Sequence, residues 1–131
     1  MELGKIFTEK EAELLNVLTL AYVGDAAQSL YVRHNLAANG DFKAGELHKR
    51  ASGCVNAHTQ AETVAKLWDK LTEKEQSVYL RGRNAKTHHK AKNQSGADYR
   101  KATGFEALIG YLYLTGDYER MTELLGEAYE N

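Results

Sequence analysis

Two long apolar stretches limit the folds that are open to this chain. They cover residues 16–32 (NVLTLAYVGDAAQSLYV) and 103–115 (TGFEALIGYLYLT), and each is apolar on nearly every side rather than along one stripe. Such a pattern is typical of a helix that is surrounded by other elements. The sequence therefore predicts two helices at the centre of the fold, each buried by neighbouring segments.

The rest of the chain indicates a single all-α domain. Its 131 residues include no proline, and apolar residues recur at helical spacing through most of the length. Two capping-box patterns, Thr8 with Glu11 and Thr72 with Glu75, predict the starts of two helices. We expect one domain over residues 1–131, a helical bundle around the two central helices. Both apolar stretches are too short and too interrupted by charge to cross a membrane.

The sequence favours the cytoplasm as the compartment of this protein. Its one cysteine, Cys54, cannot form an internal disulfide. The first residues carry charged side chains instead of a basic stretch followed by an apolar signal core. We therefore expect a soluble cytoplasmic protein.

Each apolar stretch contains a single charged residue, Asp25 in the first and Glu106 in the second. A lone carboxylate in a buried helix is costly unless a positive charge meets it. A shared Mg²⁺ ion is one such partner, because Mg²⁺ prefers a few carboxylates together with water and the phosphate oxygens of a substrate. This arrangement suits metal-assisted phosphodiester hydrolysis. The alternative is that each carboxylate pairs with a lysine or arginine.

Positive charge is concentrated between residues 81 and 101. This segment holds seven basic residues and one acidic residue, so that it carries +6 while the rest of the chain carries −7. Such asymmetry is typical of a surface that binds a polyanion, although a solvated basic loop has the same composition. Because residues 86–96 lack an apolar period, we expect a mobile basic loop at about residues 84–97. The candidate RNA-binding residues are Arg81, Arg83, Asn84, Lys86, Lys90, Lys92 and Arg100.

Two motifs resemble those of the ribonuclease III family. Residues 21–26 (AYVGDA) are similar to the family's signature helix, and residues 104–110 (GFEALIG) are similar to its second catalytic helix. The middle region, around residues 45–50 and 54–56, is also similar, so the resemblance covers most of the chain. We expect this chain to lack the family's usual double-stranded-RNA-binding domain, since only a short helix is predicted after the second motif. In this respect the chain resembles the compact Mini-ribonuclease III subgroup, which trims large-subunit (23S) ribosomal RNA precursors.

The resemblance implies roles for three residues. Asp25 and Glu106 match two of the family's four acidic catalytic and metal-binding positions, whereas the position three residues before Glu106 is Thr103. The family forms homodimers through its signature helix, and Tyr22 occupies the position of an aromatic residue that enters the partner subunit. The resemblance thus implies a dimer with two sites, one for each strand of a duplex.

We expect a Mg²⁺-dependent endoribonuclease that cleaves double-stranded RNA and leaves 5′-phosphate and 3′-hydroxyl ends, as the resemblance implies. We expect its substrate to be precursor ribosomal RNA. A ribosomal protein that presents this RNA to the enzyme is an additional candidate partner. Two alternatives are a catalytically weak RNA-binding or ribosome-assembly module with the same fold, and an all-α protein-interaction domain with structural carboxylates.

Overall fold

The computed structural model describes residues 2–40, 57–86 and 96–129, together with positions 43, 45, 46 and 49. Every long regular element in these residues is a helix, which confirms the all-α prediction. No helix in the described part of the chain has the length and apolar character needed to cross a membrane. The elements are α1 (Glu9–Leu14), α2 (Val17–Asn39), α4 (Ala57–Leu67), the 3₁₀ helix η1 (Trp68–Lys70), α5 (Glu73–Asn84), α6 (Gly96–Leu114) and α7 (Tyr118–Tyr129).

Side chains next to the helix starts satisfy the free backbone N–H groups there. Both predicted capping boxes are present: the Thr8 hydroxyl accepts from the Glu11 N–H at 3.1 Å, and the Glu11 carboxylate accepts from the Thr8 N–H at 3.0 Å. Thr72 and Glu75 make the same pair of bonds ahead of α5. These bonds replace partners that the first turn of a helix lacks. Local sequence therefore sets where α1 and α5 begin.

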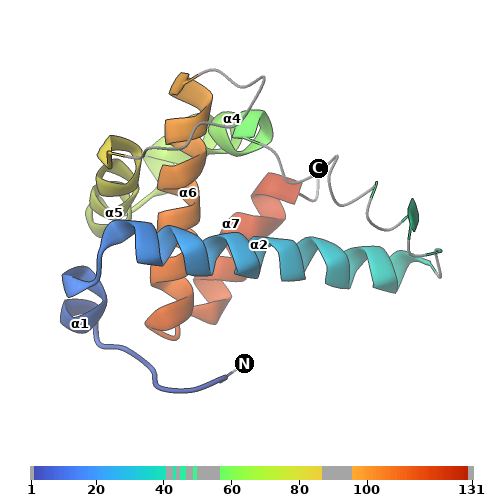
Figure 1. The fold of residues 1–131 in the computed structure, drawn as a ribbon, viewed down its shortest axis with the longest axis horizontal. Coiled ribbons are helices and arrows are strands. Elements are labelled where there is room, and N and C mark those ends of the chain that lie inside the picture. Colours follow the sequence, from blue (N-terminus) through green and yellow to red (C-terminus); the bar gives the residue numbers. More distant parts are fainter. Residues whose placement is uncertain are drawn as a thin grey trace.

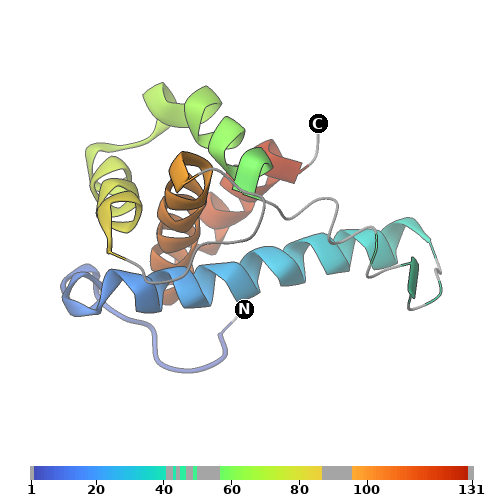
Figure 2. The ribbon, with the colours of Figure 1, turned by 45° about the horizontal axis from the view of Figure 1, so that its top comes forward.

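Helix α6 is the centre of the fold. Figures 1 and 2 show it crossed by the long helix α2, with α5 on one side, α7 on the other and α4 near its start. Its residues are buried around the whole circumference over nearly three turns, from Ala102 to Leu112, with Glu106 as the one partly buried exception. The prediction of an enclosed central helix is confirmed for this stretch.

Helix α2 is enclosed less completely than its sequence predicts. Its buried residues repeat about every fourth position, at Leu20, Gly24, Gln28 and Val32, and they define one face against the other helices. The opposite face carries Tyr22, which is 81% exposed. The C-terminal half of α2 extends beyond the other helices (Figures 1 and 2). No other described element covers this outer face, so its apolar side chains meet solvent in the single chain.

A tight turn joins α7 to the end of α6, and an ion pair joins it to α5. Gly116 ends α6 with φ of +78°, a conformation that glycine adopts without strain. Arg120 on α7 then donates to both carboxylate oxygens of the buried Glu75 on α5 at 2.9 Å, and to the Lys70 carbonyl at 2.9 Å. One guanidinium thus connects α7, η1 and α5.

Candidate active site

The crossing of α2 and α6 is made of direct backbone contact. A Cβ atom on Gly24 would lie 1.7 Å from the Glu106 carbonyl oxygen, and a Cβ on Gly110 would lie 1.8 Å from the Leu20 carbonyl oxygen. Only glycine permits an approach this close. The crossing therefore brings Asp25, the neighbour of Gly24, to the side of Glu106.

The two carboxylates lie in different surroundings. Glu106 is partly buried, and this burial, with a smaller contribution from the negative charge of Asp25, raises its pKa to about 8. Asp25 is exposed, so the expectation that both carboxylates are buried is wrong for this residue in the single chain. The physical reason is that Asp25 lies at the edge of the buried face of α2, whereas Gly24 and Leu20 lie on that face and contact α6. One site thus combines a poorly solvated carboxylate with a freely solvated one.

Neither carboxylate has a positive partner within the residues that the structure describes. The ion pairs found there join other acidic residues to lysine, arginine or histidine. A carboxylate that is withdrawn from water beside a second carboxylate is unfavourable when ionised. A cation bound between Asp25 and Glu106 would relieve both the desolvation and the repulsion.

The donor set fits Mg²⁺ better than a softer metal. Two carboxylates supply hard oxygen ligands, and the described residues contain no group of three or more His, Cys, Asp or Glu side chains that could enclose a metal. The Thr103 hydroxyl, one turn before Glu106, donates to the Tyr99 carbonyl at 3.0 Å and is buried against its own helix. A metal here would therefore keep most of its coordination positions for water and a substrate.

Comparisons with known proteins identify the family of this chain. Residues 18–117 match the model of the ribonuclease III domain. This match covers well over half of the chain and includes both carboxylates. The chain belongs to the ribonuclease III family.

The similar proteins are close to this chain in length as well as in sequence. Mini-ribonuclease 3 of Brevibacillus brevis is 48% identical over 92% of this chain and 90% of its own length. Mini-ribonuclease 3 of Streptococcus pneumoniae is 43% identical over 88% of this chain and 91% of its own length. The X-ray crystal structure of a Fusobacterium nucleatum protein superimposes with a TM-score of 0.77 at 28% identity, covering 86% of this chain and 90% of that one. The predicted family and the prediction that the chain is an endoribonuclease are confirmed.

The basic residues assigned to RNA lie in several places. The Arg81 guanidinium donates to the Leu15 carbonyl at 3.3 Å and joins α5 to the end of α1. Arg83 is partly buried and its Nε donates to the Asn84 side chain at 3.1 Å. Lys86 and Arg100 are exposed on the two sides of the predicted basic loop.

The predicted basic loop at about residues 84–97 stays a prediction. In the described residues, α5 ends at Asn84 and α6 begins at Gly96. Lys90 and Lys92 lie outside the described residues, as does the predicted mobility of the loop. The sequence analysis counted Lys101 in the charge of this segment without assigning it a role; it lies on α6 and lines, together with Arg83, a hollow described below.

Proposed function

We propose that this ribonuclease III domain, spanning residues 1–131, hydrolyses phosphodiester bonds of double-stranded RNA and leaves 5′-phosphate and 3′-hydroxyl ends. Asp25 and Glu106 hold Mg²⁺ in this proposal. One observation carries it: the contact of Gly24 with the backbone of Glu106 places two carboxylates together without a cation from the described chain. The Mini-ribonuclease 3 names of the similar proteins support the same activity.

The protein's own groups contribute position and charge to the reaction. Bound Mg²⁺ supplies a lower pKa for a coordinated water and neutralises charge on the scissile phosphate. Asp25 is exposed and free to reach an incoming ligand, whereas Glu106 is held by a buried helix on both sides of its position. The rigid α6 backbone and the Gly24 contact keep the two oxygen donors from separating. This preorganisation reduces the ordering that the site must undergo when substrate arrives.

The duplex and a second subunit complete the proposed assembly. Exposed cations that flank the α5–α6 connection, including Lys86 and Arg100, supply positive charge for the phosphate backbone. The uncovered outer face of α2 presents Tyr22, and Asp25 lies at the edge of this face. A homodimer formed through α2 would bury Tyr22 and hold two sites, one for each strand.

The proposed cellular substrate is the precursor of large-subunit (23S) ribosomal RNA in the cytoplasm. The support is the similarity of the chain to the Mini-ribonuclease 3 proteins over nearly their whole length. A ribosomal protein that presents this RNA is a further proposed partner. Incubation of the purified protein with total precursor RNA, followed by mapping of new 5′ ends, tests this substrate with and without added ribosomal proteins.

The direct test of the active site is the variant Asp25→Asn. It keeps the shape of the side chain but removes the negative charge, so we expect Mg²⁺-dependent cleavage of duplex RNA to fall by several orders of magnitude. The thermal unfolding temperature should stay the same or rise, because repulsion with Glu106 disappears. Gel-based cleavage assays with Mg²⁺ or EDTA, and thermal unfolding followed by circular dichroism, give both readouts.

Asp69→Asn is the matched control, because Asp69 is an exposed carboxylate on η1, away from the α2–α6 crossing. It should cleave like the natural protein. Full cleavage by Asp25→Asn would contradict the metal-binding role. Wild-type protein that binds duplex RNA without Mg²⁺-dependent cleavage would instead identify the RNA-binding module considered above.

A further inference from the structure

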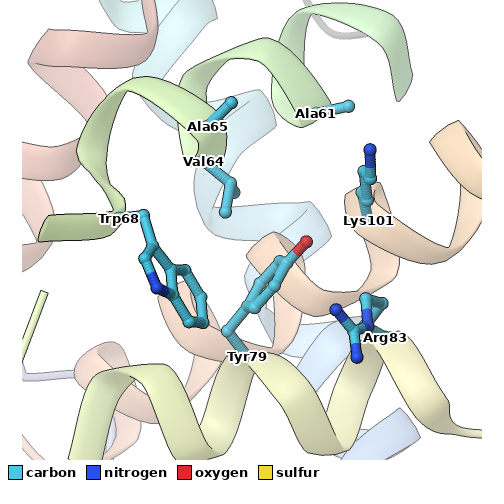
Figure 3. A pocket seen from close by; sticks show the side chains of 7 residues that line it. All are labelled: Ala61, Val64, Ala65, Trp68, Tyr79, Arg83 and Lys101. Atoms are coloured by element: carbon cyan, nitrogen blue, oxygen red, sulfur yellow. The ribbon is translucent and has the colours of Figure 1, made fainter. Parts of the chain in front are cut away.

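A hollow of about 260 Å³ lies between α4, α5 and the start of α6, separate from the two carboxylates. Figure 3 shows Trp68 at one side of it and the cationic side chains of Arg83 and Lys101 at the other, with the Tyr79 ring between them. None of the described residues that line it is acidic. The lining residues are Ala61, Val64, Ala65, Trp68, Tyr79, Arg83 and Lys101.

The aromatic wall of the hollow is held in place by packing. The Tyr79 ring lies against Gly104 of α6 so closely that a Cβ there would be 2.6 Å from ring carbon Cε2. Trp68 meets Tyr79 edge to face, with ring centroids 5.5 Å apart. Tyr79 is 4% exposed, and burial raises the pKa of its phenol, an effect that the nearby charge of Arg83 opposes. The wall is thus rigid before any ligand arrives.

The two cations come from different helices and converge on the hollow. Arg83 extends from the last turn of α5 and Lys101 from the second turn of α6 (Figure 3). Within the described residues neither forms an ion pair with a carboxylate. Two unpaired cations beside an apolar surface are complementary to a ligand that has a phosphate group and a flat, weakly polar body.

We propose that this hollow binds one unpaired nucleotide of the RNA substrate, with its phosphate between Arg83 and Lys101 and its base against Trp68 and Tyr79. This inference rests on the proposed function for the identity of the RNA. Bases inside a duplex are stacked and cannot enter such a hollow, so the site requires an unpaired base at an end, bulge or loop. The volume lies near the lower limit for small-molecule sites, which suits a ligand the size of one nucleotide.

The first experiment uses the intrinsic fluorescence of Trp68, which is the single tryptophan of the chain. Adenosine 5′-monophosphate should change this emission saturably, and adenosine or inorganic phosphate alone should bind at least about tenfold more weakly, because each lacks half of the contacts. Lys101→Ala should weaken nucleotide binding by about tenfold or more. Ala65→Leu, a change at an exposed lining position, should also reduce binding by filling the hollow.

Lys66→Ala is the matched control, since Lys66 is an exposed cation on α4 that does not line the hollow. It should bind the nucleotide like the natural protein. Fluorescence changes that do not saturate, or that are the same in Lys101→Ala and Lys66→Ala, would overturn the proposal. Equal affinity for inorganic phosphate and the nucleotide would overturn the role of the base.

The second experiment keeps this proposal separate from the proposed cleavage. Binding of a blunt duplex and of the same duplex with one unpaired terminal nucleotide is compared in the Asp25→Asn background, where cleavage does not interfere. The unpaired nucleotide should improve binding, and Lys101→Ala should remove that gain while leaving the affinity for the blunt duplex nearly unchanged, because a blunt duplex places no nucleotide in the hollow. Equal affinity for the two duplexes would overturn the inference even if the natural enzyme cleaves RNA.

Discussion

Asp25 and Glu106 differ by one methylene group, yet their surroundings give them different properties. Glu106 is partly buried on a central helix and its pKa is raised to about 8 by burial and by Asp25, whereas Asp25 is exposed. Burial costs a carboxylate the water that stabilises its charge. The pair consequently favours a bound cation, because neutralising the charge of one carboxylate lowers the free-energy cost of ionising the other.

Glu75 shows the opposite effect of surroundings on a carboxylate. Burial disfavours its ionised form, but hydrogen bonds from Arg120 and from the Thr72 N–H outweigh this, so the pKa of Glu75 is lowered below its usual value of 4.5. A group with a lowered folded-state pKa stabilises the fold above its unfolded pKa. That stabilisation is lost as the pH falls from about 4.5 through the lower folded-state value.

We therefore predict that Glu75→Gln lowers the free energy of unfolding at pH 7 by about 1.5–3 kcal/mol, the size of hydrogen bonds to a charged group. The variant should lose less further stability than the natural protein between pH 5 and pH 3. Urea unfolding at pH 7, 5 and 3 measures both effects. Glu123→Gln is the control: Glu123 also bonds Arg120, at 3.0 Å, but is 62% exposed, so its loss should cost less than about 1 kcal/mol. Equal costs for both variants would contradict this explanation.

Helices α2 and α6 depend on glycine at their crossing. Gly24 and Gly110 let the two backbones touch. Each glycine also makes its helix about 1 kcal/mol less stable than alanine would at the same position. Close approach of these two helices is what aligns Asp25 with Glu106. The two glycines therefore lower the helix propensity of α2 and α6 but make the geometry of the site possible.

Gly24→Ala should destabilise the protein by about 3 kcal/mol or more, although alanine favours a helix, because the new methyl group has backbone 1.7 Å away and the helices must separate. Cleavage should fall as well, since Asp25 moves away from Glu106. Gly4→Ala is the control, because no atom lies within 4 Å of a Cβ there. Chemical denaturation measures the stability of both variants. An unfolding midpoint for Gly24→Ala equal to that of Gly4→Ala would contradict the close crossing.

The outer face of α2 is exposed in the single chain and would be buried in the proposed dimer. Tyr22 is 81% exposed and Leu30 is 52% exposed on a helix that no other described element covers on that side. Large apolar side chains grouped on one surface are typical of an interface. Because Asp25 lies at the edge of this face, dimer formation would also bury part of the surroundings of the site.

Tyr22→Ala should weaken the dimer by about 2–4 kcal/mol, the usual cost of emptying an aromatic interface pocket. Sedimentation at micromolar concentrations measures the shift from dimer to monomer. Leu14→Ala is the control, because Leu14 is 78% exposed but lies on α1. A natural protein that sediments as a monomer, or a Tyr22→Ala dimer of unchanged affinity, would contradict the interface.

Much of the helical framework follows from short-range patterns in the sequence. Thr8 and Thr72 cap helices because their partners stand three residues later, where a single turn brings them into hydrogen-bonding distance. The enclosure of α6 follows from apolar residues on all its sides. These features involve neighbours on one helix, so no knowledge of the rest of the fold is needed. The two carboxylates were identifiable in the same way, as lone charges in apolar stretches.

Contacts between distant segments determined the geometry of the site and of the hollow. The meeting of Asp25 and Glu106 depends on the Gly24 contact between helices, and the exposure of Asp25 depends on which side of α2 the other helices leave open. The hollow between Trp68, Tyr79 and Lys101 likewise forms only where separate helical segments pack side by side. Periodicity places a residue on a face of its own helix, but the depth and angle of packing between helices fix which faces meet. The residue types of Asp25 and Glu106 were therefore enough to propose a site, while the packing of the helices determined its geometry.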